Sequence, residues 1–247
     1  MDADLEFRNK NMRKAGKIAS QILKLVCEEA KEGVSLLELD NLAESLCYQY
    51  ETRPAFKGYD GFPNTLCVGV NDVVVHGIPD NYRLKSGDIV SLDFGLIYKK
   101  VYSDTAYTVM IGKVNDKVKH FVQTVEKALY AGIAQAVTGN HVGDIGYAMQ
   151  SLVEENGYSV VREMVGHGVG YELHEDPYIP GYGKKGKGEE LYEGQSIAIE
   201  AIVNMGKKEI FINRKDGWTS KTKDGSLSGL FEHTVIVGKK PEILTVW

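Results

Sequence analysis

The hydrophobic positions at the start of the chain follow the period of an α-helix. Between about residues 5 and 32, Ile18, Ile22, Leu25 and Val26 fall on one stripe of a helical surface. Such a stripe packs against other apolar surface, while charged residues cover the remaining faces. The segment is therefore predicted to be a long scaffold helix.

A second helix is predicted to begin after Ser35. Ser35 and Glu38 have the spacing of a capping box, in which each side chain accepts a hydrogen bond from the backbone N–H of the other residue. Helical spacing returns later in the chain, at residues 116–137 and 143–156. Two pairs of helices are thus expected, one pair in each half of the sequence.

Alternating or valine-rich segments between the helices predict β-strands. These segments lie at residues 65–75 with a break at Asn71-Asp72, at 88–96, at 101–110, at 160–165, at 195–204, and at several places between 211 and 237. Short turns join the earlier segments, which is typical of an antiparallel sheet.

The order of helices followed by strands occurs twice, and three motifs repeat with it. GVSLLELDNLAESL (33–46) aligns with GNHVGDIGYAMQSL (139–152), LKSGDIVSLD (84–93) with LYEGQSIAIE (191–200), and HGIP (76–79) with HEDP (174–177). This duplication predicts an α+β fold with a pseudo-twofold antiparallel sheet and helices packed on one face. We expect a single domain, 1–247, built from halves of approximately 1–110 and 111–247, with a site in the cleft between them.

Composition and charge exclude several classes of protein. The 247 residues carry 29 Lys and Arg against 34 Asp and Glu, a net charge of −5, so no basic field holds nucleic acid or an anionic membrane. Neither a signal peptide nor a transmembrane run of about 18 apolar residues is evident, which favours a cytoplasmic protein. Cys27, Cys47 and Cys67 form no C-x-x-C pair, so any metal needs other ligands.

Acidic residues at the ends of apolar strands are the first candidates for chemistry. The repeat aligns Asp93 with Glu200, although either residue alone could be a solvated strand end. If Tyr98-Lys99 centre a hairpin turn, Asp104 lies directly opposite Asp93, with the side chains roughly 5 Å apart. Like charges so placed are destabilising, and a divalent cation between them is the simplest explanation.

The second half supplies matching groups. Glu232 is predicted to occupy the place that Asp104 has in the first half, and four inward carboxylates would need two divalent ions for neutralisation. His167 lies in the glycine-rich VGHGVG; such a histidine is more often structural, but four nearby acids favour a ligand. His76 and His174, matched by the repeat, are expected on opposite walls of the cleft.

Several motifs together resemble the type I methionine aminopeptidases of bacteria, over essentially the whole chain. They are NDVVVHGIP, the spacing of Asp93 and Asp104, GHGVGYELHEDP, AIEAIVNMGKKEI and KDGWTSKTKDGSLSGLFEHTVIV. The resemblance implies the duplicated pita-bread fold. It also implies two divalent metal ions, held by Asp93, Asp104, His167, Glu200 and Glu232. Carboxylates and one imidazole admit Mn, Fe(II) or Co as readily as Zn, so the metal stays undecided.

The resemblance further implies the reaction. The enzyme would remove the N-terminal methionine from nascent proteins and peptides with a small second residue, by dinuclear-metal-assisted hydrolysis of the first peptide bond. A water shared by the ions would attack the carbonyl, with its proton handled by Glu200. His174 would stabilise the oxyanion, and His76 would contact the scissile amide.

The methionine pocket is likewise assigned by similarity. It would be lined by Tyr59, Phe62, Cys67 and Trp218, for each of which ordinary core packing is the alternative. Three residues depart from the usual pattern of the family and affect the expected pocket shape and rate: Phe56, Leu173 and Ala201.

Two other functions are alternatives to this one. An Xaa-Pro dipeptidase or creatinase-like enzyme has the same fold but usually a substantial N-terminal domain, and a metal-free binding protein would have lost some of the five ligands, which are all present. The expected partners are nascent polypeptide N-termini, with transient ribosome association, no nucleic acid specificity and no membrane. Family habit suggests a monomer.

Overall fold

A computed structural model describes residues 3–247. The helices are α1 (Ala3–Glu29), α2 (Leu36–Gln49), α3 (Asp116–Ile133) and α4 (Val142–Glu155), with a short 3-10 turn, η1, at Tyr59–Gly61. The predicted capping box begins α2: the Glu38 N–H donates to Ser35 Oγ at 3.2 Å, and the Ser35 N–H donates to Glu38 Oε2 at 2.7 Å. The four predicted helices are confirmed, with ends that differ by a few residues.

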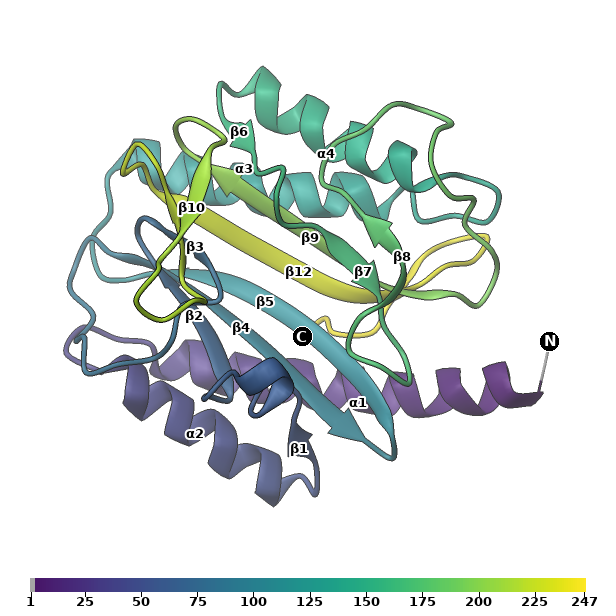
Figure 1. Ribbon diagram of the computed structural model, residues 1–247, viewed down its shortest axis with the longest axis horizontal. Coiled ribbons are helices and arrows are strands. Elements are labelled where there is room, and N and C mark those ends of the chain that lie inside the picture. The colour runs from purple at the N-terminus through teal and green to yellow at the C-terminus, as the bar shows by residue number, and fades with distance from the viewer. Residues whose placement is uncertain (1–2) are drawn as a thin grey trace.

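One antiparallel sheet runs through both halves of the chain, in the order β1-β4-β5-β12-β9-β7-β8, with β2 paired to β4, β6 to β9 and β13 to β12 (Figure 1). Its strands are β1 (Arg53–Pro54), β2 (Leu66–Val70), β4 (Ile89–Tyr98), β5 (Val101–Met110), β6 (Ser159–Val160), β7 (Gly166–Gly168), β8 (Glu175–Ile179), β9 (Ser196–Asn204), β12 (Ser228–Ile236) and β13 (Glu242–Ile243). A smaller sheet joins β3 (Val73–Val75), β11 (Ser220–Thr222) and β10 (Ile210–Ile212).

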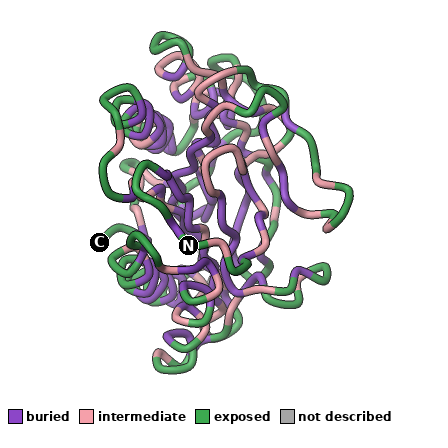
Figure 2. Tube along the Cα trace, turned by 90° about the vertical axis from the view of Figure 1, so that its left-hand side faces the viewer, coloured by how far each residue is buried: buried purple, intermediate pink, exposed green. Residues whose placement is uncertain are grey.

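The helices pack on one face of the main sheet, as the sequence predicts. α1 lies against β4 and β5, and α3 lies against β9 and β12. Apolar side chains from these elements form two large clusters, one around Leu92 and Phe94 and the other around Phe121 and Phe231. Figure 2 shows buried strands in the interior and exposed residues along the outer sides of helices and on loops. The opposite face of the sheet is therefore free to carry a site.

The prediction of a strand at residues 160–165 is wrong. Only Ser159–Val160 pairs there, as β6, and the chain next enters the sheet at β7 and β8. The Gly-His-Gly sequence of β7 has no apolar alternation, and β8 begins on two acidic residues, so neither has the signal of a strand. The break at Asn71-Asp72 is confirmed, and Asn71 has the left-handed φ of 54° that a tight turn needs.

None of the helices in residues 3–247 has the length and hydrophobicity that a bilayer-spanning helix needs.

Candidate metal centre and active site

A single row of side chains crosses five strands on the face away from the helices. Cys67 on β2 pairs with Asp93 on β4, Asp93 with Ala106 on β5, Ala106 with Glu232 on β12, and Glu232 with Glu200 on β9. Directly paired residues point to the same face of a sheet. The row therefore brings three carboxylates together, and only the small methyl of Ala106 separates Asp93 from Glu232.

The predicted pairing of Asp93 with Asp104 is wrong by two positions. The turn of the β4–β5 hairpin is Lys99-Lys100, with φ values of 46° and 70°, so Asp104 lies opposite Gly95. Two-residue turns with positive φ at both positions suit the twist of a hairpin. Since a shift of two residues preserves the face, Asp104 still lies on the side of Asp93, as its diagonal neighbour.

The predicted equivalence of Glu232 and Asp104 is also wrong. Glu232 lies directly opposite Glu200, whereas Asp104 is displaced from Asp93 along its strand, so Glu232 corresponds in register to Ala106. The hairpin of β10 and β11 lengthens the second half, so distance along the chain does not give the register. Asp104, the second carboxylate of the first half, therefore has a different register position in its strand from Glu232, the second carboxylate of the second half.

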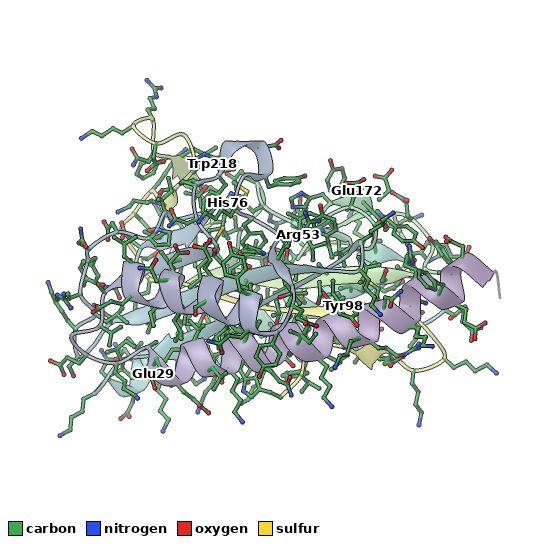
Figure 3. The ribbon with its side chains drawn as sticks, turned by 90° about the horizontal axis from the view of Figure 1, so that it is seen from below. Glu29, Arg53, His76, Tyr98, Glu172 and Trp218 are labelled. Atoms are coloured by element: carbon green, nitrogen blue, oxygen red, sulfur yellow. The ribbon has the colours of Figure 1, made fainter. Side chains whose placement is uncertain are left out.

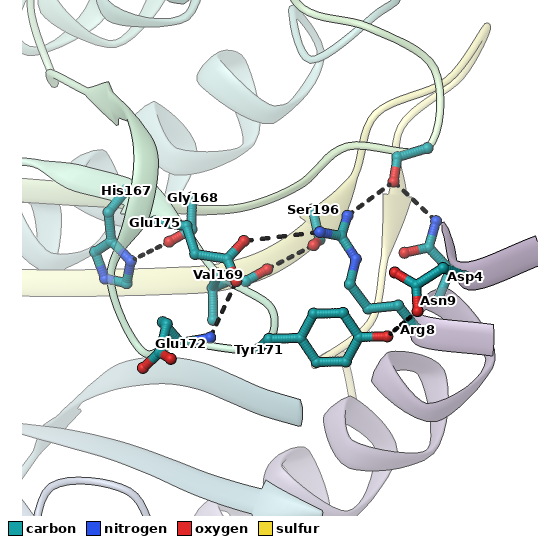
Figure 4. Close-up of polar contacts among 11 residues, drawn as sticks. Asp4, Arg8, Asn9, His167, Gly168, Val169, Tyr171, Glu172, Glu175 and Ser196 are labelled. Carbon is teal, nitrogen blue, oxygen red and sulfur yellow. Dashed lines mark hydrogen bonds and ion pairs between the residues drawn. The ribbon is translucent and has the colours of Figure 1, made fainter. Parts of the chain in front are cut away.

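His167 joins this group from the neighbouring strand. It lies on β7 opposite Ala198, and its Nε2 is 3.6 Å from Glu200 Oε1. Its Nδ1 donates to the Gly168 carbonyl oxygen at 2.9 Å (Figure 4). The flanking glycines are required, because a Cβ at Gly166 would lie 2.4 Å from the Ala198 oxygen. Close approach of the β7 backbone to β9 thus positions the imidazole.

Burial raises the pKa of all four carboxyl groups. The pKa of Asp104 is raised to about 7 and that of Glu200 to about 8, mainly by burial and, for Glu200, by the charge of Asp104. Burial, followed by neighbouring carboxylates, raises the pKa values of Asp93 and Glu232 well above their usual range. Burial also lowers the pKa of His167 to about 4, with a further contribution from His174. The imidazole is therefore neutral at pH 7 and offers no compensating charge.

These side chains have the properties of a divalent-metal site. Ligand atoms of Asp104, His167 and Glu232 lie within 4.8 Å of one another, and all three residues are buried. Asp93 Oδ1 and Glu232 Oε1 are buried without a hydrogen-bond partner in residues 3–247. Unpaired buried carboxylate oxygens are costly unless a cation satisfies them. Oxygen-rich ligands with one imidazole fit Mn, Fe, Co or Zn.

The carboxylates lie in a pocket of about 340 Å³ that has several aromatic side chains in its walls. The rings of Phe62 and Trp218 pack edge to face with centroids 5.2 Å apart, and the centroids of the His76 and Trp218 rings are 6.3 Å apart. Figure 3 shows His76 and Trp218 together on the side of the sheet away from α1. The φ of His76 is 57°, an uncommon conformation that is found preferentially at functional sites. Every predicted pocket residue and histidine lines this pocket: Tyr59, Phe62, Cys67, His76, His174 and Trp218.

His174 also lines this pocket, and the loop that carries it is held by the N-terminal turns of α1. The Tyr171 hydroxyl donates to Asp4 Oδ1 at 2.9 Å, and Arg8 Nη1 is 3.7 Å from Glu175 Oε2 (Figure 4). Burial lowers the pKa of His174, so this ring is neutral as well. Contacts remote in sequence therefore fix the loop before any substrate arrives.

Sequence reasoning missed part of the lining. Residues 163–165 and Tyr178 also line the pocket, and so do Phe56 and Leu173, two of the departures from the family pattern. Residues 163–165 form no regular element, so no periodicity marks them; their only signal is their position just before the Gly-His-Gly motif. Ala106 was missed because an alanine in a strand suggests packing alone.

The fold and the carboxylate-rich pocket are those of a metallopeptidase. Residues 10–239 match metallopeptidase family M24, and the chain belongs to this family. It is 43% identical over 236 residues to the methionine aminopeptidase of Clostridium perfringens, covering 95% of this chain and 94% of that one. It is 42% identical over 226 residues to methionine aminopeptidase 1 of Bacillus subtilis, covering 92% and 91%.

Solved structures of methionine aminopeptidases are also similar to this chain. The crystal structure of methionine aminopeptidase from Rickettsia prowazekii superposes with a TM-score of 0.95 at 39% identity, covering 98% of each chain. The expected pita-bread fold is thereby confirmed. Prolidase from Pyrococcus horikoshii superposes with a TM-score of 0.76 at 24% identity, covering 97% of this chain and 62% of that one. At that identity the likeness concerns the fold alone.

Proposed function

We propose that this protein is a methionyl aminopeptidase, which hydrolyses the first peptide bond of proteins and peptides that begin with methionine and have a small second residue. Identity of about 40% over nearly the full length to methionine aminopeptidases supports this. The observation that carries it is the row of buried carboxylates beside an aromatic pocket. Such a pocket suits an unbranched thioether, because sulfur packs well at ring edges.

We propose two divalent ions, held by Asp93, Asp104, His167, Glu200 and Glu232. Bound there, they would supply Lewis-acid polarisation of the scissile carbonyl, an activated water and an anchor for the substrate amine. Asp104 is displaced by two residues from the row of Asp93, Glu232 and Glu200, and this asymmetric arrangement supports two metal positions rather than one. Four carboxylates also carry more negative charge than a single divalent ion neutralises.

The remaining roles belong to protein groups. Glu200 would take up the proton of the attacking water on a carboxylate oxygen and pass it to the departing amine. His174, neutral at the pocket wall, would donate a hydrogen bond to the developing oxyanion, and His76 on the opposite wall would contact the scissile amide. Tyr59, Phe62, Cys67 and Trp218 would enclose the methionine side chain.

Two measurements test the function directly. The purified protein, loaded with Mn²⁺ or Co²⁺, should bind two equivalents of metal and release methionine from Met-Ala-Ser. An Ala-Pro dipeptide is the matched control, because an Xaa-Pro dipeptidase of the same fold would cleave it. Cleavage of Ala-Pro in preference to Met-Ala-Ser would assign the protein to the other branch of the fold, and inactivity with no bound metal would identify a binding protein.

We also propose that the enzyme works in the cytoplasm as a monomer close to the ribosome, where nascent N-termini emerge. The segment containing β10 and β11 supports proximity to the ribosome, because its exposed cations outnumber its exposed acids, Glu209 and Asp224. The exposed cations are Lys207, Lys208, Arg214, Lys215 and Lys223. The same segment carries Trp218 of the pocket. A basic surface there suits a polyanionic particle, and binding to ribosomes in sedimentation should weaken steeply with salt.

A further inference from the structure

His174 has one side-chain hydrogen bond within residues 3–247. Its Nδ1 lies 2.8 Å from the Tyr59 hydroxyl, and the two rings meet edge to face with centroids 5.2 Å apart. His167 also uses its Nδ1, but its partner is a carbonyl oxygen, that of Gly168. The two imidazoles, 4.3 Å apart, therefore have chemically different partners at the same ring atom.

The partner of His167 determines where its proton lies. A carbonyl oxygen can only accept, so the neutral ring carries its proton on Nδ1 and keeps a lone pair on Nε2. That Nε2 is the atom 3.6 Å from Glu200 Oε1, within the carboxylate cluster. His167 is thus set up as an acceptor or ligand through Nε2.

The partner of His174 sets the opposite tautomer. A phenol hydroxyl is protonated at neutral pH, and His174 Nδ1 is the acceptor available to it among the described residues. A ring that accepts at Nδ1 carries its proton on Nε2 when it is neutral. His174 then presents an N–H donor through Nε2, where His167 presents a lone pair.

The backbone holds Tyr59 in place for this contact. Around η1, the Tyr59 N–H donates to the Phe56 carbonyl oxygen at 2.9 Å, and the Phe62 N–H donates to the Tyr59 carbonyl oxygen at 2.8 Å. Gly58 and Gly61 have φ values of 89° and 87°, which glycine adopts without strain. The phenol is therefore placed by a closed turn rather than by a free loop.

We propose that Tyr59 is a positioning residue that holds His174 as the Nε2–H tautomer, so that this ring presents a hydrogen-bond donor to the substrate carbonyl oxygen. The step rests on the proposed function, since a donor is useful there only if hydrolysis takes place in this pocket. It gives Tyr59 a role beyond contact with the methionine side chain.

The tautomer can be measured without any reaction. Long-range ¹H–¹⁵N correlation spectra of the ¹⁵N-labelled full-length protein, with and without Zn²⁺, distinguish protonated from bare ring nitrogens, and His174→Ala identifies the signals of His174. We expect a bare Nδ1 and a protonated Nε2 in the wild type, and a mixture of tautomers in Tyr59→Phe. Tyr48→Phe is the matched control, because it removes a phenol hydroxyl that donates to Glu44 on α2, outside the pocket. It should leave the signals unchanged.

Kinetics complete the test. Tyr59→Phe should lower kcat for Met-Ala-Ser roughly 3- to 10-fold, as expected for loss of one hydrogen bond, while KM stays nearly constant because the aromatic ring remains. In a His174→Ala background the same substitution should have no further effect on kcat. Phe62→Leu, which alters only the wall of the pocket, should instead raise KM and leave the tautomer as it is.

Two results would overturn the proposal: a wild-type His174 protonated on Nδ1, or a Tyr59→Phe protein whose His174 tautomer is unchanged. If the wild type hydrolyses no Met-Ala-Ser while the spectra behave as expected, the proposed function fails and the tautomer assignment stands. The two failures are thus distinguishable.

Discussion

Glu200 and Glu232 lie directly opposite each other on β9 and β12, and within residues 3–247 neither forms an ion pair with a lysine or arginine. In the described chain the nearest ion-pairing partner of Glu200 is His167, which is neutral at pH 7 because burial lowers its pKa to about 4. The metal-free site is therefore a local source of instability, and cation binding should relieve it.

Replacing Glu232 by Gln should stabilise the metal-free protein. Burial raises the pKa of Glu232, so ionising this group above its unfolded pKa costs folding free energy that the amide does not. We expect a gain of about 1–2 kcal/mol at pH 8 in the presence of EDTA, at the expense of metal binding. Urea unfolding measures it, and the exposed Glu209→Gln should change stability by less than about 0.5 kcal/mol. Destabilisation by Glu232→Gln would contradict the charge argument.

Metal binding should release protons at neutral pH. In the metal-free protein the pKa values of Asp104 and Glu200 are raised to about 7 and about 8, so both groups are partly protonated at pH 7. A metal must displace these protons, and its apparent affinity therefore falls as the pH is lowered through this range. Calorimetric titration in buffers of different ionisation enthalpy counts the protons. Equal heats in all buffers would exclude the raised pKa values.

Asp104→Ala should lose most activity and at least one equivalent of metal, because the ligand atom of Asp104 is within 4.8 Å of those of His167 and Glu232. Elemental analysis after gel filtration, with turnover of Met-Ala-Ser, checks this. Glu155→Ala, at the exposed end of α4, is the control and should retain both properties. Full metal content with normal turnover in Asp104→Ala would remove this residue from the site.

His174→Ala should keep its metal but lose kcat by roughly 10²-fold or more, as expected when a donor to a developing oxyanion is removed. The exposed His120, outside the pocket, supplies the control His120→Ala. Steady-state kinetics at fixed Mn²⁺ separate an effect on kcat from an effect on KM. A change confined to KM would mean that His174 binds substrate without taking part in the chemical step.

Substrate choice should follow the shape of the pocket. Leu-Ala-Ser should have a kcat/KM about 10- to 200-fold below that of Met-Ala-Ser, because a branch at Cγ changes an apolar fit worth only about 1–3 kcal/mol. Formyl-Met-Ala-Ser should not be cleaved, since the free amine is expected to bind metal. Met-Phe-Ser should be a poor substrate, because its second residue is large. Comparable values for the methionine and leucine peptides, or cleavage of the formylated one, would refute this view of the pocket.

The sequence by itself determined the elements and the chemical groups of the site. Helical and alternating periodicities are local properties, so the four helices and the long strands could be predicted from neighbouring residues. The duplication and the charge of Asp93, Asp104, Glu200 and Glu232 pointed to one cleft. The prediction that Asp93 and Asp104 lie on the same face of the sheet was correct although their predicted pairing was wrong. A register shift of two residues preserves the side-chain direction.

Only the tertiary structure decided how these groups meet. The register of β4 with β5 depends on which two residues adopt positive φ in the turn, and two lysines give no signal of this. The place of Ala106 between Asp93 and Glu232 needs strands from both halves to pair. The contact of Tyr59 with His174 joins residues 115 positions apart. Long-range packing fixes such contacts, and no local pattern in the sequence encodes them.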